Sequence, residues 1–154
     1  MGDKENLFRE LFAEWLSRQD FDSSWYVQKA LKQLSISDLG TEFLIEWVAS
    51  DPETRAGVLA DVIGAPGGRP SELHAALLDR FEAYGVGSAF SSSFMSGMFM
   101  GSFAEWTRSR LESARHWLED KRPAIREWAR GLVTSLEEQL KSSERREEEE
   151  RFRY

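Results

Sequence analysis

Residues 117–132, which read Trp-Leu-Glu-Asp-Lys-Arg-Pro-Ala-Ile-Arg-Glu-Trp-Ala-Arg-Gly-Leu, constrain the fold more than any other stretch of the chain. Trp117 ends one apolar helical stripe, and Ile125 begins the next. Between them, Asp120 and Pro123 suit a tight turn, and proline is favoured at the first position of a helix. The stretch therefore predicts the end of one helix, a tight turn and the start of a second helix.

The rest of the chain shows the same helical periodicity. Apolar residues recur three and four positions apart, as in Leu7, Leu11 and Trp15, and no alternating strand pattern competes with them. The pattern predicts an all-α fold of about seven helices. They cover residues 4–18 and 25–35, open at Ser37 and at Asp51-Pro52, run from 70–72 to 84–85, cover 102–119 and start again near Pro123.

The chain has the length and composition of one domain. It has 154 residues, of which 41% are hydrophobic and 12% aromatic, which is enough for one core. Residues 1–141 are predicted to form a single helical domain. Residues 142–154 are rich in charge, and Glu147 and Arg151 have the i,i+4 spacing that stabilises a helix. We therefore expect a solvated helical extension at the C-terminal end.

Composition argues against several classes of function. The net charge is −7 and the pI is near 5.0, whereas a general nucleic-acid binder needs a basic face. No apolar run approaches the about 20 residues of a membrane span, and the N-terminus lacks the apolar segment of a signal peptide. The absence of cysteine fits a reducing compartment. We expect a cytoplasmic protein that binds neither nucleic acid nor membrane.

An aromatic residue recurs near the end of the first helix of each predicted helix pair. Trp15, Trp47, Phe81 and Trp117 are separated by 32, 34 and 36 residues. A period of this length with two helices per unit is typical of helical repeat arrays, whose units bury their apolar faces by stacking on their neighbours. The aromatic residues are therefore predicted to be structural anchors of the repeats.

Residues 120–132 contain an Asp, a Pro, an aliphatic–Arg pair and a small residue at fixed spacing, and the stretch resembles the inter-helix turn and second helix of HEAT repeats. The resemblance implies antiparallel helix pairs stacked as a short HEAT-like solenoid, or as an irregular bundle, that serves as a scaffold for partners. It also implies that Asp120 caps the second helix and that Arg126 bonds across to the neighbouring unit. In the second unit these roles would fall to Asp51 and Arg55.

The last third of the chain is also similar to C-terminal helical segments that accompany prokaryotic ATPase or effector domains. This similarity implies a fragment or subunit of a larger prokaryotic assembly, of a kind involved in phage defence.

Residues 85–101 interrupt the regular pattern. They are rich in Ser, Gly, Met and Phe, and no helix is predicted there, although the third unit needs its second helix in this place. Their apolar side chains either fold back onto the core, as apolar loop residues usually do, or form an adaptable surface for a protein partner. The candidates for such a surface are Phe90, Phe94, Met95, Met98, Phe99, Met100 and, in the next helix, Trp106.

The sequence predicts no catalytic residue, metal ligand or cofactor. Residues 64–70 follow a helix and lack the Gly-Lys-Ser/Thr of a phosphate loop, and His74 and His116 lie on different helices without a second ligand at metal-binding spacing. We expect a non-enzymatic module for protein–protein or interdomain interaction. Two alternatives stay open: a bundle that self-associates through residues 85–101, and an enzyme or small-molecule binder with an unrecognised pocket.

Overall fold

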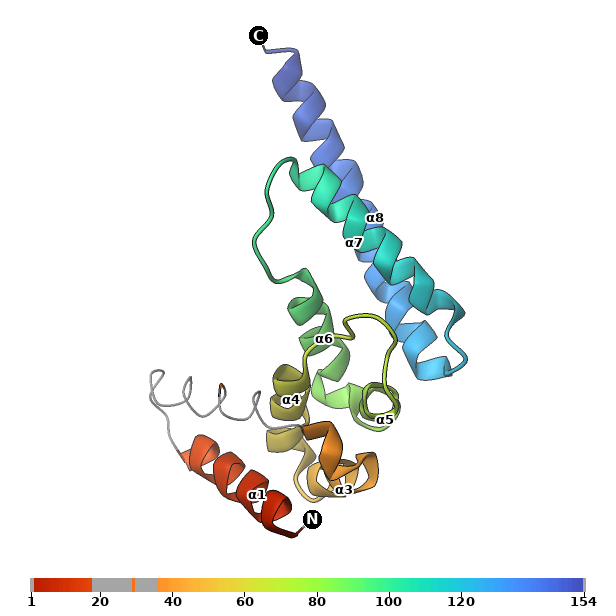
Figure 1. Cartoon of the computed structure of the whole chain (residues 1–154). Helices are drawn as coiled ribbons and strands as arrows, with labels where there is room; N and C mark the ends of the chain where they lie inside the picture. The colour runs from red at the N-terminus through yellow and green to blue at the C-terminus, as the bar shows by residue number, and fades with distance from the viewer. Residues whose placement is uncertain (1, 18–28, 30–35, 154) are drawn as a thin grey trace.

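A computed structural model describes residues 2–17, 29 and 36–153 (Figure 1). Over these ranges the chain is all-α, with seven α-helices packed together and no strand, which confirms the expected fold class. The helices are α1 (Gly2–Ser17), α3 (Thr41–Ala49), α4 (Pro52–Ile63), α5 (Glu72–Phe81), α6 (Val86–Met95), α7 (Phe103–His116) and α8 (Pro123–Arg151). Short 3-10 helices lie at Ile36–Leu39, Glu82–Tyr84 and Trp117–Glu119. The helix expected over residues 25–35 falls outside the described residues, apart from residue 29.

Capping residues in the sequence mark the starts of several helices. Both α4 and α8 begin with a proline. The Ser71 hydroxyl accepts the backbone N–H of His74 at the start of α5, and the Ser102 hydroxyl accepts that of Glu105 at the start of α7. These bonds satisfy amides that a first helical turn leaves without a partner. Asp51 precedes α4, but its side chain makes no capping hydrogen bond.

The prediction that the third helix opens at Ser37 is wrong. A 3-10 turn occupies Ile36–Leu39, and α3 begins only at Thr41. Gly40 separates the two with φ of 83°, a conformation that glycine adopts without strain and that interrupts a continuous helix. The apolar stripe of α3 is nevertheless packed inwards, with Trp47 buried.

Helix α6 corrects the expectation of no helix within residues 85–101. Gly85 precedes it with φ of 82°, and the helix then runs from Val86 to the middle of the stretch. Val86, Phe90 and Phe94 are spaced by four residues and are all buried. Burial of this stripe compensates for the weak helix propensity of the Gly and Ser residues between them.

The helices pack around one hydrophobic core. Helix α3 contacts α4 and α5, while α4 contacts α5 and α6. Helix α1 joins through Phe8, whose ring centroid lies 5.3 Å from that of Trp47. Helices α7 and α8 form a long antiparallel hairpin, and α8 packs against α5 (Figure 1). The ring of Trp128 on α8 lies 6.0 Å from Phe90 on α6, which links the hairpin to the other helices.

The far end of α8 projects beyond the core. Leu136 is the last buried residue of the helix, which continues to Arg151. In Figure 1 this end extends past the start of α7. An i,i+4 ion pair of 3.8 Å joins Arg145 to Glu149 on its surface. The projecting end still contributes to the site described next, because Glu147 bonds to the residues that open α7.

Candidate partner-binding surface

An exposed apolar loop joins α6 to α7. Residues 96–101, named here the Met–Phe loop, place Met98 and Met100 almost wholly in solvent, with exposed fractions of 100% and 98%. Phe99 between them is 44% exposed. Glycines near both ends of the loop have φ of 126° and 95°, values that other residues rarely adopt. The loop therefore presents three apolar side chains to solvent.

The foot of the Met–Phe loop is attached to both helices of the hairpin. The ring centroid of Phe99 lies 5.2 Å from that of Phe103 and 5.6 Å from that of Trp106, both on α7. The Ser102 hydroxyl donates to the Glu147 carboxylate on α8. This bond is the main reason that the pKa of Glu147 is lowered. The residues at the C-terminal end of the loop are thus held by contacts with both α7 and α8.

Two of the candidate surface residues, Phe90 and Phe94, lie in the core instead. Helix α6 turns both rings inwards, so that Phe90 meets Trp128, and Phe94 meets Trp117 with a centroid distance of 5.0 Å. For these two phenylalanines the structure therefore shows the first of the two alternatives, packing of the apolar side chains onto the core. The four-residue spacing of the apolar residues in α6 was the signal for burial.

The other five candidates lie at or near the surface. Met95 and Trp106 are half-buried. Met98, Phe99 and Met100 are exposed and adjacent in sequence. The adaptable apolar surface therefore has a smaller extent than residues 85–101 suggest.

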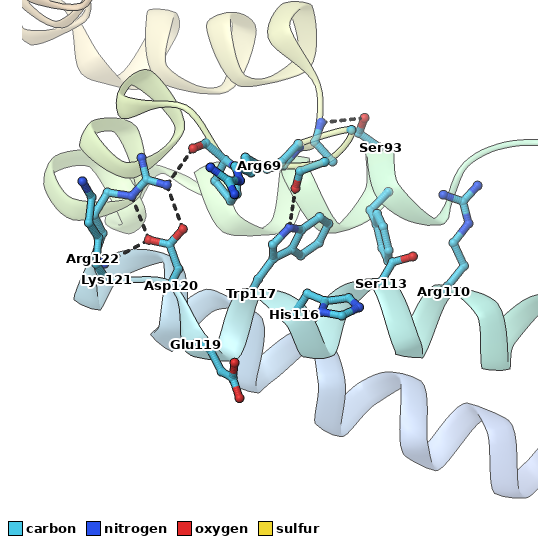
Figure 2. A pocket seen from close by; sticks show the side chains of 16 residues that line it. Arg69, Ser93, Arg110, Ser113, His116, Trp117, Glu119, Asp120, Lys121 and Arg122 are labelled. Carbon is cyan, nitrogen blue, oxygen red and sulfur yellow. Dashed lines mark hydrogen bonds and ion pairs between the residues drawn. The ribbon is translucent and has the colours of Figure 1, made fainter.

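A groove lies between α7 and the loop that joins α4 to α5, residues 64–71 (Figure 2). We name it the basic groove. Its volume is about 1030 Å³, and its lining comes from residues within 65–70, 93–94 and 110–122. Trp117 points toward the 64–71 loop, where its indole N–H donates to the carbonyl of Gly68 at 2.8 Å (Figure 2). Four lining side chains are Arg or Lys and two are acidic.

At one end of the basic groove, the turn before α8 is bonded to the 64–71 loop. Arg122 donates through Nε and Nη2 to the two oxygens of Asp120, both at 2.8 Å. It also donates to the carbonyl of Pro70 at 2.6 Å. The hydrogen bonds from Arg122 lower the pKa of Asp120 from 3.8 to about 2. Asp120 is therefore a carboxylate near neutral pH, with its charge directed at Arg122.

The roles that the HEAT resemblance implies for this turn are distributed differently. Arg122, not Asp120, is the N-cap residue of α8, and no side chain caps that helix. Asp120 lies two residues before the N-cap, so the one backbone N–H that its carboxylate accepts is that of Arg122, at 2.9 Å. Arg126 donates to the carbonyl of Asp120 within its own turn. The bond across to another helix pair is made by Arg122, through Pro70.

Three of the four aromatic residues predicted to be repeat anchors have described side chains. Trp47, Phe81 and Trp117 are buried, whereas Trp15 belongs to α1 and its side chain falls outside the description. Arg55 on α4 donates to the carbonyl of Trp47 on α3 at 2.9 Å, so it too bonds within its own helix pair, whereas the HEAT resemblance implies a bond across to a neighbouring pair.

Arg110 lies where the basic groove meets the foot of the Met–Phe loop. Its guanidinium carbon is 5.1 Å from the ring centroid of Phe94 and 5.3 Å from that of Trp106, within the range of cation–π attraction. Its Nη2 atom lies 3.8 Å from the position that a Cβ on Gly97 would take. No sequence motif predicts this role, because the groove draws its cations from segments far apart in the chain.

The two histidines lie in separate places. His74 contacts the Gly64 carbonyl through Nε2 at 2.9 Å and the Ser71 backbone N–H through Nδ1 at 3.2 Å. A backbone amide can only donate, so Nδ1 accepts and Nε2 carries the proton. His116 is exposed in the lining of the basic groove. In the part of the chain that the structure describes, no group of three or more His, Cys, Asp or Glu side chains could hold a metal ion.

Among the described helices, none has the length and apolar character needed to cross a membrane. Comparison of the chain with known protein families, with curated proteins and with solved structures finds no match.

Proposed function

We propose that this protein is a non-enzymatic helical module that binds a protein partner, or another domain of the same polypeptide, through the Met–Phe loop. The observation that carries the proposal is the complete exposure of Met98 and Met100 beside the partly exposed Phe99. Apolar surface removed from water contributes about 25 cal/mol per Å² to association. Unbranched, polarisable Met side chains adapt to the surface that they contact.

The attachment of the loop supports a binding role. Phe99 packs on Phe103 and Trp106, and the Ser102–Glu147 hydrogen bond holds the adjoining residues to α8. A loop that is already held in place loses less conformational entropy when a partner binds. Binding residues are common on loops that a rigid scaffold positions in this way.

We also propose that the scaffold is a short HEAT-like array. The contacts of α3 with α5, and of α4 with α6, support stacking of equivalent helices in the second and third units. The last unit departs from that arrangement, because α5 packs against α8, the second helix of the following pair. The similarity of the last third to prokaryotic effector-associated segments supports a cytoplasmic, defence-related assembly as the setting.

Site-specific crosslinking tests the proposed contact. The photo-reactive residue p-benzoylphenylalanine replaces Met98 in the chain as produced in its native source, and the adduct is identified by mass spectrometry. Phe152, which is 83% exposed on the projecting end of α8, is replaced in the control. We expect a discrete adduct from position 98 that position 152 does not give.

A triple variant, Met98→Ser with Phe99→Ser and Met100→Ser, should then reduce recovery of that partner at least about tenfold, because a few buried anchors dominate binding energy. Its circular dichroism should match that of the unchanged chain. Retention of the partner would refute the proposal. An adduct between two copies, together with a doubled mass in light scattering, would instead support the alternative of self-association. Three apolar side chains are few for a stable homodimer, whose interface buries about 1,200 Å² or more.

A further inference from the structure

The basic groove differs in chemistry from the Met–Phe loop beside it. We infer that the groove binds an acidic peptide segment of the same partner whose apolar residues contact the loop. The inference rests on the proposed function for the nature of the partner, and it adds a second, electrostatic contact that the exposed loop does not require.

The charge of the groove carries the inference. Its four Arg and Lys side chains and two acids leave a net charge of +2, in a chain whose net charge is −7. One of the acids, Asp120, is already bonded to Arg122. Neither Arg69 nor Arg110 makes a hydrogen bond or ion pair with the described residues. A local patch that keeps a net positive charge after its own acids are counted attracts an anionic partner.

The two unpaired arginines belong to opposite sides of the groove. Arg69 comes from the 64–71 loop and Arg110 from α7 (Figure 2). Contacts with the rings of Phe94 and Trp106 position the Arg110 guanidinium. The planar fork of a guanidinium binds a carboxylate through two parallel hydrogen bonds. The arrangement therefore suits side-chain carboxylates of an occupant that lies between the two sides.

Continuity with the Met–Phe loop favours a peptide over a free small anion. Arg110 lines the groove, contacts Trp106 at the foot of the loop and lies beside Gly97 within it. The groove volume of about 1030 Å³ is that of a site for a much larger ligand than one inorganic ion. A single extended segment can place apolar residues on the loop and carboxylates along the groove.

Peptide selection tests the inference without knowledge of the partner. The full chain is used to select from a random dodecapeptide phage library, and the recovered sequences are compared with the input. We expect an excess of Asp and Glu next to an apolar residue. A synthetic peptide of the best sequence should bind more weakly as salt rises, and its Asn/Gln counterpart should bind at least about tenfold more weakly, because hydrogen bonds to charged groups are lost.

Charge reversal tests whether the acidic residues of the selected peptides bind in the basic groove. Arg69→Glu with Arg110→Glu should weaken binding of the synthetic peptide about a hundredfold, because two charge-assisted contacts are lost. Lys141→Glu with Arg146→Glu makes the same change of net charge on exposed positions of α8 outside the groove, and should change binding less than about threefold. Arg69→Glu alone, on the exposed loop, provides the test if the double variant loses its helical circular dichroism.

Several outcomes would overturn the inference. Recovery of no peptides, recovery without an acidic excess, or full binding by the Arg69 and Arg110 variants would each do so. Inorganic phosphate that raises the melting temperature through Arg110, without peptide selection, would assign the groove to a small anion instead. The Met–Phe triple variant separates the two proposals. If the triple variant binds the peptide normally while charge reversal abolishes binding, the loop proposal fails and the groove assignment stands. If the triple variant loses binding while the charge-reversed variant keeps it, the groove assignment fails and the loop proposal stands.

Discussion

His74 joins the two ends of the 64–71 loop. Its Nε2–H donates to Gly64 and its Nδ1 accepts from Ser71. Burial of the ring, which lies 5.1 Å from that of Phe90, lowers the pKa of His74. The hydrogen bond to the Gly64 carbonyl opposes this effect, whereas the positive charge of Arg122 adds to it, and the pKa remains below its ordinary value. The histidine is therefore neutral in the folded chain at neutral pH. The 64–71 loop forms one side of the basic groove. The protonation state of His74 therefore affects the shape of that groove.

Protonation of His74 should destabilise the fold. The added proton would occupy Nδ1 and remove the acceptor for Ser71. The folded-state pKa lies below the ordinary 6.5, so the unfolded chain binds more protons as pH falls through 6.5, and the free energy of unfolding decreases toward lower pH. Urea unfolding measured between about pH 7.5 and pH 5 should show this decrease. It should persist in His116→Gln and shrink in His74→Gln; an undiminished decrease in His74→Gln would contradict the assignment.

Asp120 should make stability depend on pH in the same direction as His74, but over a lower range of pH. Asp120→Asn removes the negative charge and one of the two oxygens that accept from Arg122, and should lower the free energy of unfolding by about 1–2 kcal/mol. Because the pKa of Asp120 is lowered from 3.8 to about 2, the contribution is complete near neutral pH and is lost as pH falls through that interval. Glu119→Gln, at the exposed neighbouring position, should change stability by less than about 0.5 kcal/mol. Equal effects of the two substitutions in urea unfolding would exclude a special role for the pair.

Among the helices, α6 changes the interpretation most, because it moves two candidate contact residues into the core. Phe90→Ala should lower the free energy of unfolding by about 3–5 kcal/mol, as truncation of a buried aromatic ring does. Met98→Ala, at a fully exposed side chain, should change it by less than about 0.5 kcal/mol. Denaturant unfolding of the two variants measures the difference. A small effect of Phe90→Ala would mean that α6 does not pack as described.

The start of α6 depends on the conformation of Gly85. Its φ of 82° is in the left-handed region, so Gly85→Ala should lower the free energy of unfolding by about 1–2 kcal/mol although no atom obstructs the added Cβ. Gly131→Ala is the matched control, since Gly131 lies within α8 and its Cβ position is also open. That change should raise stability by about 0.5–1 kcal/mol. Thermal unfolding should therefore show shifts of opposite sign.

The sequence predicts helices best where caps and prolines mark their ends. Pro52 and Pro123 open helices at the expected residues. The prediction failed at Ser37, because a glycine three residues later breaks the helix, and within residues 85–101. There, Ser and Gly conceal a helix whose stability comes from tertiary burial instead of intrinsic propensity. The four-residue spacing of Phe90 and Phe94 indicates a helix, but the high content of Gly and Ser in this stretch argued against one.

In the whole molecule, α8 connects the core to the Met–Phe loop. Near its start, the indole N–H of Trp128 donates to the carbonyl of Gly87 at 3.1 Å and to the Ser91 hydroxyl at 3.0 Å. Near its far end, Glu147 accepts from Ser102. Helix α8 therefore helps α7 to position the loop relative to the core, and the exposed end of α8 contributes to this through Glu147.

Removal of the Glu147 contact should loosen the loop without unfolding the domain. In Glu147→Gln, backbone amides of residues 96–104 should exchange hydrogen faster, because Ser102 and the first amides of α7 lose a charged acceptor. The melting temperature should stay close to that of the unchanged chain, since Leu136 is the last buried residue of α8. Glu148→Gln, at an exposed position, is the control. Equal exchange in the two variants would show that the bond does not restrain the loop.

The sequence by itself determined the all-α class, the junctions at Pro52 and Pro123, and the presence of a Met- and Phe-rich stretch, because periodicity, capping and turn preferences are local properties. Only the tertiary structure decided which of those apolar residues are exposed. It also brought Arg69 and Arg110 to opposite sides of one groove. Both outcomes depend on how helices pack and on contacts between segments that are distant in the chain. The local sequence of one segment does not show which distant segment it will contact.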